Sequence, residues 1–366
     1  MGVYEELGLR PAINASGKMT ALGGSVLDDA VVAAMGEAAR SHVVMEDLLR
    51  VAGRVIAETT GAEDGCPTTG AASGIAIAVA AVIAGSNPAQ VEMLPDAGGR
   101  PCEVLLLKGH SVNFGAPVRQ MIALGGGRAT EVGSVNKVSA AHLESSITER
   151  TAALLFVQSH HTVHKGQITL TEMIATGKRH GIPVIVDAAA EDDLRRWPAT
   201  GADLVVFSGG KAIGGPTSGL ICGTHELIES CRSQYTGIAR PMKVGKETVL
   251  GLLQALRQYG NEQAGDGGLD RMTRLADRLG NLSGVTGTVE QDEAGRHIYR
   301  AVLTIDPAKA GRDAQALARE LAAGDPPVFL RDHQAGTGRL SVDPRPITAD
   351  EEEQLVRRFT SVLGAS

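Results

Sequence analysis

Short apolar runs, separated by helical stretches, constrain the fold of this chain more than any other feature. TAALLFV (151–157), PVIVD (183–187) and DLVVFS (203–208) are apolar over most of their length, and LTEMIATGKRHG between the first two has the pattern of a helix. Strands that are apolar throughout are buried on both faces, as in a parallel sheet that helices cover on both sides. The sequence therefore predicts an α/β fold with a mostly parallel sheet.

The length of 366 residues allows two domains. We expect residues 1–30 to form an N-terminal arm and residues 237–366 to form a smaller α+β C-terminal domain. Residues 31–236 are expected to form a large domain, which also contains predicted strands at 91–95, 103–109 and 218–223.

The composition excludes several classes of partner. The 42 acidic residues outnumber the 35 basic residues, and the net charge of −7 argues against nucleic-acid binding, which needs a basic face. The most apolar stretch, IAIAVAAVIAG (75–85), is too short to span a membrane, and the N-terminus lacks a signal-peptide pattern. Four scattered cysteines without a CxxC pair favour reduced thiols. We expect a cytoplasmic protein without membrane or nucleic-acid partners.

One lysine, Lys211, lies among four glycines in the segment SGGKAIGGP, directly after the apolar run that ends at Ser208. The end of a strand in an open parallel sheet is where ligands bind, and the small neighbours let another molecule approach closely. A lysine in such a site can form a Schiff base with a carbonyl. The alternative is an ordinary surface lysine in a glycine-rich turn.

Asp187 ends the apolar run before that of Lys211. A buried carboxylate needs a cationic partner, although an aspartate that caps a helix is the alternative. Pyridoxal 5'-phosphate (PLP) requires such a pair, because a lysine binds its aldehyde and an aspartate keeps its pyridine nitrogen protonated. Asp187 and Lys211 together predict PLP as the cofactor.

The start of a buried helix supplies a candidate site for the cofactor's phosphate. Gly70, Ala71, Ala72 and Ser73 have the small side chains of an exposed first turn, whose N–H groups bind anions. Ser208 can add a hydroxyl. A tightly packed helix start without a ligand is the alternative. The chain has neither GxGxxG nor GxxxxGK[ST], so a dinucleotide or Walker-type loop is not predicted.

Four segments carry a resemblance to a known family: TALGGSVL, TGAEDGCPTTGAASG, VDAAAEDDL and especially FSGGKAIGGPTSGLICG. They resemble the selenocysteine synthase-related branch of fold type I PLP enzymes, and within it the D-glucosaminate-6-phosphate ammonia-lyase-like proteins. The resemblance implies an aspartate-aminotransferase-like large domain, Lys211 as the Schiff-base lysine, Asp187 as the pyridine partner, and a homodimer or higher homo-oligomer. The tRNA-dependent members usually have an acidic residue where this chain has Gly210, so a tRNA substrate is not expected.

Two histidine segments follow predicted strands. His110 lies in the loop where related enzymes place a group over the cofactor ring, so we assign it a catalytic and cofactor-binding role; a solvated loop histidine is the alternative. His160, His161 and His164 lie in a second loop. That loop lacks a nearby carboxylate or cysteine to complete a metal site, so no metal is predicted. One histidine of this loop, with His161 as the candidate, is expected to act as acid or base.

Basic residues are the candidates for substrate binding. Arg240 and Lys243, with Lys246 nearby, form a basic cluster in an otherwise acidic chain, and the alternative is a solvated face. Fold type I enzymes often bind the substrate carboxylate with an arginine of the small domain. Arg339 and Arg345 both qualify, and we take Arg345 as the candidate.

These residues predict a PLP-dependent lyase that removes ammonia from a 2-amino sugar acid or from a hydroxy amino acid, and the resemblance implies that the sugar acid is phosphorylated. The reaction is α,β-elimination to a 2-keto acid. An epimerase or racemase, an aldolase or a β-replacement transferase would use the same residues. A PLP-binding protein without turnover and a metal-dependent hydrolase are the alternatives from other classes.

Overall fold

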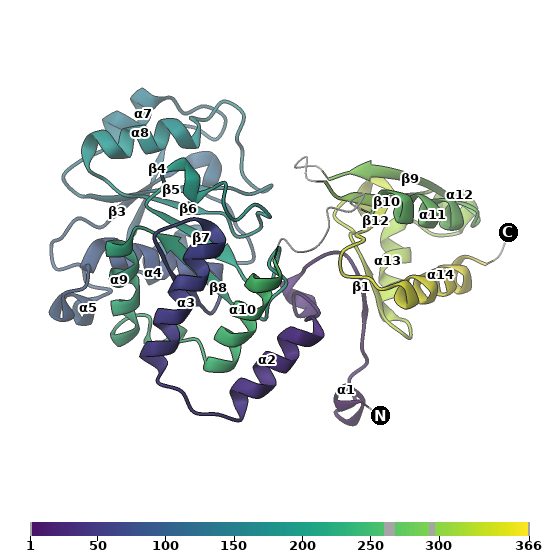
Figure 1. Ribbon diagram of the computed structural model, residues 1–366. Coiled ribbons are helices and arrows are strands. Elements are labelled where there is room, and N and C mark those ends of the chain that lie inside the picture. The colour runs from purple at the N-terminus through teal and green to yellow at the C-terminus, as the bar shows by residue number, and fades with distance from the viewer. Residues whose placement is uncertain (1, 260–267, 293–296, 365–366) are drawn as a thin grey trace. The chain divides into compact units, whose positions relative to one another are not determined.

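The computed structural model describes residues 2–259, 268–292 and 297–364, and it contains two compact units (Figure 1). The larger unit is Leu27–Tyr259, and the smaller unit is formed by the described residues of Met1–Val26 and Gly260–Ser366. The predicted boundaries at residues 30 and 236 therefore differ from those of the structure. The arm belongs to the smaller unit because β1 (Ile13–Ala15) pairs with β11 (Val328–Leu330).

The second boundary moves because α10 (Lys246–Gln258) packs against α2 (Asp29–Ala39) and α3 (Met45–Thr60). Its apolar face is buried, including Val249, Leu252 and Leu256. Since this face completes the core of the larger unit, residues 237–259 belong there rather than to the C-terminal domain.

A seven-stranded sheet in the order β2-β8-β7-β6-β5-β3-β4 forms the centre of the larger unit. Neighbouring strands from β7 to β4 are parallel, whereas β8 is antiparallel to both of its neighbours. This confirms the predicted α/β class with a mostly parallel sheet. The strands are β2 (Asp64–Thr68), β3 (Glu103–Leu107), β4 (Arg128–Val132), β5 (Thr151–Val157), β6 (Val184–Asp187), β7 (Leu204–Ser208) and β8 (Gly219–Gly223).

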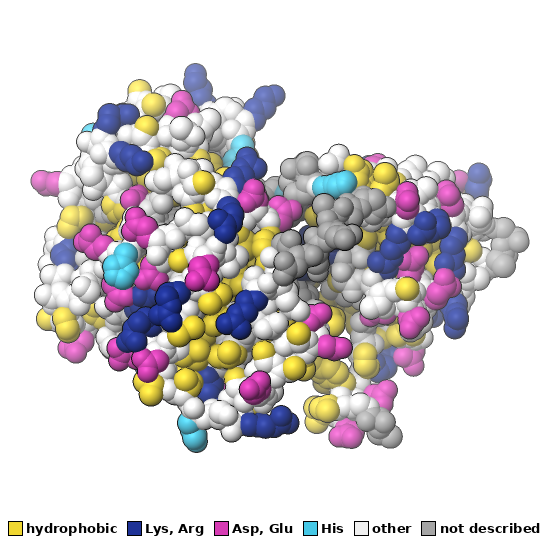
Figure 2. Space-filling model, viewed as in Figure 1, with side chains coloured by type: hydrophobic (Ala, Val, Ile, Leu, Met, Phe, Trp, Pro, Cys, Tyr) yellow, Lys and Arg dark blue, Asp and Glu magenta, His cyan; other side chains and the backbone are white. Residues whose placement is uncertain are grey.

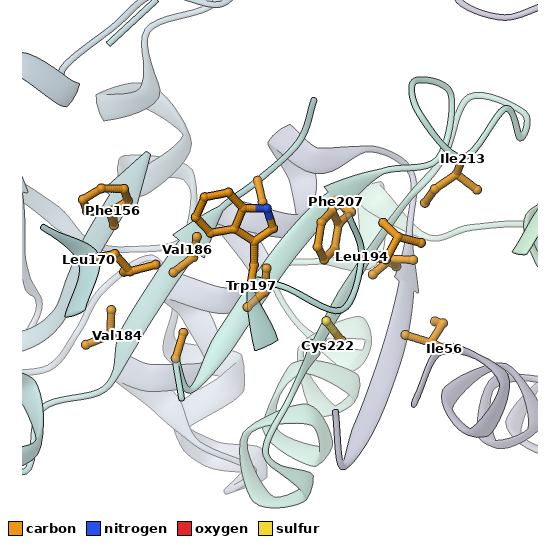
Figure 3. Packing of buried hydrophobic residues seen from close by; sticks show 14 of the residues in the cluster. Ile56, Phe156, Leu170, Val184, Val186, Leu194, Trp197, Phe207, Ile213 and Cys222 are labelled. Carbon is orange, nitrogen blue, oxygen red and sulfur yellow. The ribbon is translucent and has the colours of Figure 1, made fainter. Parts of the chain in front are cut away.

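Alternate residues of these strands pack into two different cores, one on each face of the sheet. Phe156, Val186, Phe207 and Cys222 point into the first core, where Figure 3 shows them with Trp197. The intervening residues point into the second core. Helices cover both faces: α4 (Ala71–Ala84), α5 (Pro88–Met93), α6 (Val118–Leu124), α7 (Ala140–Ser146), α8 (Leu170–His180) and α9 (His225–Ser233) join those already named.

Several short segments differ from the prediction, among them the strand β4, which was not predicted. The predicted strand at 91–95 is instead the end of α5, because Asn87 accepts hydrogen bonds from the first-turn N–H groups and Pro88 occupies the first helical position. The edge strand β2 was not predicted, since Pro67 argues against a central strand. Its position at the edge of the sheet accommodates the missing N–H of that proline.

The smaller unit is α+β, as predicted. Its antiparallel sheet has the order β12-β10-β9, and the parallel β1–β11 pair is separate from it. Apart from β1 and β11, its elements are α1 (Val3–Glu6), α11 (Leu269–Gly280), β9 (Val285–Gln291), β10 (Tyr299–Ile305), α12 (Pro307–Ala310), α13 (Ala314–Ala323), β12 (Arg339–Val342) and α14 (Ala349–Leu363).

Exposed apolar side chains gather around α2 and α3 on the face of the larger unit drawn in Figure 2. They include Val32, Val43, Val44, Met45 and Val51, each at least 36% exposed. Isolated exposed apolar residues are ordinary, but a concentration on one face is typical of a protein contact. No helix of the described part of the chain is both long and apolar enough to cross a bilayer.

Candidate active site

The sheet topology brings the predicted cofactor residues to one edge. Strands β3, β5, β6 and β7 are parallel, so the segments that follow them leave the sheet on the same side. These segments carry His110, the histidine loop 158–167, Asp187 and Lys211, respectively. β2 runs in the same direction, because it is antiparallel to β8, and it leads to Gly70. The prediction that these residues converge is therefore consistent with the order of the strands.

Asp187 is 5% exposed at the end of β6. The N–H of Ala189 donates to its Oδ1 at 3.1 Å. Burial raises the pKa of Asp187 to about 6, although the Ala189 hydrogen bond and the positive charge of Lys211 oppose that rise. The carboxylate is therefore short of positive charge, and a cationic group beside it would be bound favourably.

Lys211 follows β7 in a turn that only small residues allow. The N–H of Gly209 donates to Ser218 O and that of Gly215 to Gly209 O, both at 2.8 Å. A Cβ at position 209 would lie 2.1 Å from Ser218 Oγ, and Gly214 has a φ of +72°. The half-buried Lys211 acts on the charge of Asp187 on the adjacent strand, as the predicted pair requires.

The start of α4 has the form expected of an anion site. Gly70 provides no side-chain cap, and the nearby hydroxyls of Thr68 and Ser73 both donate to its carbonyl oxygen, at 2.8 and 2.7 Å. The first-turn N–H groups at Ala71 and Ala72 therefore have no side-chain cap within the described chain. Free N–H groups at the positive end of a helix bind phosphate.

Gly219 shows how closely this helix start is held to the sheet. A Cβ at position 219 would lie 2.6 Å from the carbonyl carbon of Gly70 and 2.8 Å from both Ala71 N and Phe207 O. Only a glycine allows β8 to pass between the helix and β7. Ser208 pairs with Gly219 across the two strands and is partly exposed at the same edge.

His110 is fully buried in the 3₁₀ turn after β3. Its Nδ1 accepts a hydrogen bond from the N–H of Val157 at 3.2 Å, which fixes the hydrogen of the neutral ring on Nε2. Burial lowers the pKa of His110 to about 3, with a further contribution from His164. Nε2 has no hydrogen-bond partner among the described residues, so a buried donor is left for a ligand.

The histidine whose ring lies beside His110 is His164, whereas His161 is the acid or base candidate from the sequence. The ring of His164 lies 5.3 Å from that of His110, edge to face, whereas the ring of His161 lies against His160 at 3.9 Å. We therefore regard His164 as the better candidate for the acid or base expected in this loop. The sequence contains no signal that separates the two, because the distinction depends on how the loop folds back.

The predicted substrate-binding residues lie in both units. Arg240, in a 3₁₀ turn, and Lys243 are exposed in the larger unit, while Lys246 donates to Ala38 O at 2.6 Å and is part of the helix packing. Arg345 lies in the smaller unit, where Asp343 accepts hydrogen bonds from its Nε and Nη2, each at 2.8 Å.

Asp343 is fully buried, which gives Arg345 a fixed orientation. Arg339, the alternative in the sequence, pairs instead with the exposed Glu290. Because the buried Asp343 holds the Arg345 side chain in place, we favour Arg345 over Arg339 as the carboxylate-binding arginine.

One further cluster contains the residue types of a metal site. Ligand atoms of Asp64, His225 and Glu229 lie within 4.8 Å of one another. However, Arg232 donates to both carboxylate oxygens of Asp64, at 2.7 and 2.9 Å, and also pairs with Glu229. The guanidinium therefore supplies the positive charge that a metal ion would bring.

The residues at the sheet edge fit PLP in three respects. Among the described residues, Asp187 is buried with a pKa raised to about 6 even beside Lys211, Nε2 of His110 has no acceptor, and the start of α4 offers N–H groups to a phosphate. PLP would meet these needs with its pyridine nitrogen, its ring and substituents, and its phosphate. The fold and this set of residues define the chain as an α/β protein of the fold type I class.

Comparison with known proteins identifies the family. Residues 12–283 match the family described as SelA: L-seryl-tRNA selenium transferase, and the chain belongs to that family. This confirms the resemblance to selenocysteine synthase-related enzymes. L-seryl-tRNA(Sec) selenium transferase from Moorella thermoacetica is 26% identical over 98% of this chain and 84% of its own length.

Two relatives are more similar. The chain is 54% identical to a 5'-C-glycyluridine monooxygenase-decarboxylase from a Streptomyces species, over 98% of this chain and 92% of the relative. It is 42% identical to D-glucosaminate-6-phosphate ammonia lyase from Salmonella typhimurium, over 98% and 97% of the two chains. A solved structure of D-glucosaminate-6-phosphate ammonia-lyase superposes with a TM-score of 0.95 and covers 99% of this chain and 98% of that one.

Proposed function

We propose that this protein is a PLP-dependent ammonia-lyase that acts on an amino acid with a hydroxyl group on its β-carbon. The observation that carries the proposal is the Asp187–Lys211 pair: a buried carboxylate with a raised pKa on one strand end, and a lysine in a glycine turn on the next. The 42% identity to an ammonia lyase over nearly the full length supports the same reaction.

Each residue at the edge has a separate task. Lys211 holds the cofactor through its amine, Asp187 pairs with the pyridine nitrogen, and the first turn of α4 (Gly70, Ala71, Ala72), with Ser208, binds the phosphate. When bound, PLP supplies an electron sink for the pair left on the α-carbon after deprotonation. His110 covers the cofactor and donates from Nε2, since its ring stays neutral.

The protein groups also move the protons of the reaction. Lys211 Nζ, once the amine of the substrate has displaced it, would remove the α-proton of the substrate. Loss of the β-hydroxyl then yields an enamine, which tautomerises and hydrolyses to a 2-keto acid and ammonia. Arg345 binds the substrate carboxylate, and the exposed Arg240 and Lys243 attract an acidic substituent such as a phosphate.

The substrate class follows from what the two similar relatives share. One name describes a phosphorylated amino sugar acid, and the other describes a uridine that carries a glycyl group. Both are amino acids attached to a sugar-derived chain, and we infer the same class here. The 54% identity to the second relative favours oxidative decarboxylation of a glycyl nucleoside as the second candidate function.

Parallel assays separate the two functions. Purified protein with PLP is incubated with D-glucosaminate-6-phosphate while ammonia and 2-keto acid are measured, and with 5'-C-glycyluridine while oxygen uptake and carbon dioxide are measured. We expect ammonia release, and we expect Lys211→Ala to abolish both that release and the ~420 nm absorbance of the lysine-bound cofactor. Retention of both by Lys211→Ala would refute the proposal.

We also propose a cytoplasmic homodimer. The exposed apolar side chains around α2 and α3 support a contact with a second copy. Light scattering on the purified protein is expected to give twice the chain mass, and replacement of Val44 by Asp is expected to shift it toward the monomer. A monomer in the unmodified protein would contradict this part of the proposal.

A further inference from the structure

We propose that His164 is a catalytic residue that donates a proton from Nδ1 to the β-hydroxyl as that group leaves the substrate. The inference rests on the proposed elimination and deepens it, because it names the acid that the reaction needs. Hydroxide is a poor leaving group, so a positioned acid contributes substantially to such a step.

A short chain of hydrogen bonds fixes which nitrogen of His164 carries the hydrogen. The hydroxyl of Thr162 donates to Ser159 O at 2.6 Å, and the same oxygen lies 2.7 Å from His164 Nε2. A hydroxyl has only one hydrogen, so Thr162 Oγ1 must accept from Nε2. Nε2 therefore stays protonated in both forms of the ring, and Nδ1 is the nitrogen that gains and loses a proton.

The loop that carries His164 is attached to the candidate site at two points. Gln158 N donates to Asp187 O at 2.8 Å, and Val163 N donates to Gly109 O at 3.0 Å. These bonds hold the loop between the pyridine partner and the turn of His110. The ring contact with His110 shows that the His164 side chain turns toward this edge.

His164 also differs from His110 in its access to water. His110 is fully buried and stays neutral, so it cannot deliver a proton as an imidazolium near neutral pH. His164 is exposed and can be reprotonated by solvent after each turnover. The ring of His161 packs instead against that of His160.

The proposed step balances without a redox reagent. Lys211 takes the α-proton, and the electron pair of the broken Cα–H bond forms the Cα–Cβ double bond. The Cβ–O bond breaks with its pair on oxygen, and the proton from His164 Nδ1 converts the leaving group to water. Solvent then returns a proton to His164 and takes one from Lys211.

The test compares two reactions of the same holoenzyme. His164→Gln is expected to lower kcat for ammonia release by roughly 10²–10⁴-fold, as for loss of a general acid. The ~420 nm band is expected to remain, since it reports cofactor binding. Exchange of the substrate α-proton in D₂O is expected to continue, because Lys211 performs it. His160→Gln, in the same loop, is the matched control and should keep kcat.

A second variant tests the hydrogen-bond chain without turnover. Thr162→Val removes the acceptor for Nε2–H, so ¹⁵N spectra of the cofactor-free protein should show the His164 ring losing its single tautomer. Its kcat should fall less than that of His164→Gln. The proposal is wrong if His164→Gln keeps kcat, if the loss follows His161→Gln instead, or if α-proton exchange disappears together with ammonia release. If the unmodified protein binds PLP but releases no ammonia, the proposed function is wrong and this inference falls with it.

Discussion

Replacement of Asp187 by Asn is expected to stabilise the cofactor-free protein at pH 8 while weakening cofactor binding. Burial raises the pKa of Asp187 from 3.8 to about 6. The pKa of Asp187 is higher in the folded protein than in the unfolded chain. Asp187 therefore makes its full favourable contribution to the free energy of unfolding below the unfolded-state pKa, and this contribution is lost as pH rises through the folded-state pKa. The lost stability amounts to about 3 kcal/mol at pH 8 and roughly half of that at pH 5.

Asn cannot ionise, so the variant avoids this cost. The Oδ1 of the asparagine side chain could still accept a hydrogen bond from the N–H of Ala189. Its side-chain NH₂ group would be buried, and leaving it unpaired would reduce the gain in unfolding free energy by about 1–3 kcal/mol at every pH. The pH dependence is therefore the sharper signature. The unfolding free energy of the variant, relative to that of the unmodified protein, should rise by about 1.5 kcal/mol between pH 5 and pH 8.

The assay is urea unfolding of both cofactor-free proteins at pH 5 and pH 8, followed by titration with PLP at pH 8. The variant should bind PLP more weakly, since it cannot neutralise a protonated pyridine nitrogen. If the difference in unfolding free energy between the two proteins stays constant with pH, the fold does not raise the pKa of Asp187. Unchanged PLP affinity would refute its pairing with the cofactor.

Two further substitutions test other parts of the structure. Gly219→Ala should weaken PLP binding and cost roughly 1–3 kcal/mol in urea unfolding, because its Cβ would meet backbone on both sides. Gly36→Ala in α2, whose Cβ would meet no atom beyond its own helix within 4 Å, should keep or slightly raise the stability. Asp343→Asn should cost about 3–5 kcal/mol in the same assay, since it breaks a buried ion pair, and should raise KM more than it lowers kcat. Arg339→Gln is its exposed control, and equal losses from the two variants would contradict the assignment.

The sequence was sufficient to predict five of the seven strands of the main sheet and its mostly parallel order. Asp187 and Lys211 each follow an apolar run, and the topology of a parallel sheet places such positions together. The strand β2 was harder to predict, because its pairing with β8 decides its conformation and Pro67 argues against a strand. The domain boundary was missed for a similar reason: α10 has an ordinary amphipathic pattern, and only packing shows which core its apolar face joins.

The choice among the histidines shows a different limit. His161 and His164 lie in the same loop, and both are exposed. What separates them is a hydroxyl that donates to Ser159 and must therefore accept from His164. Such an arrangement depends on the path of the loop, which no hydrophobic pattern specifies.

Burial also divides the titratable groups of the site into those whose protonation state is fixed and those that can exchange protons with water. His110 is held neutral by complete burial, and Asp187 resists ionisation until a cation lies beside it. A cofactor with a protonated ring nitrogen would therefore find a carboxylate that gains from its charge and an imidazole that does not repel it. Proton exchange during turnover then falls to groups nearer the solvent, and His164 lies on that side of His110. In the proposed mechanism, the same gradient of burial assigns cofactor binding to the deep residues and protonation of the leaving group to the loop.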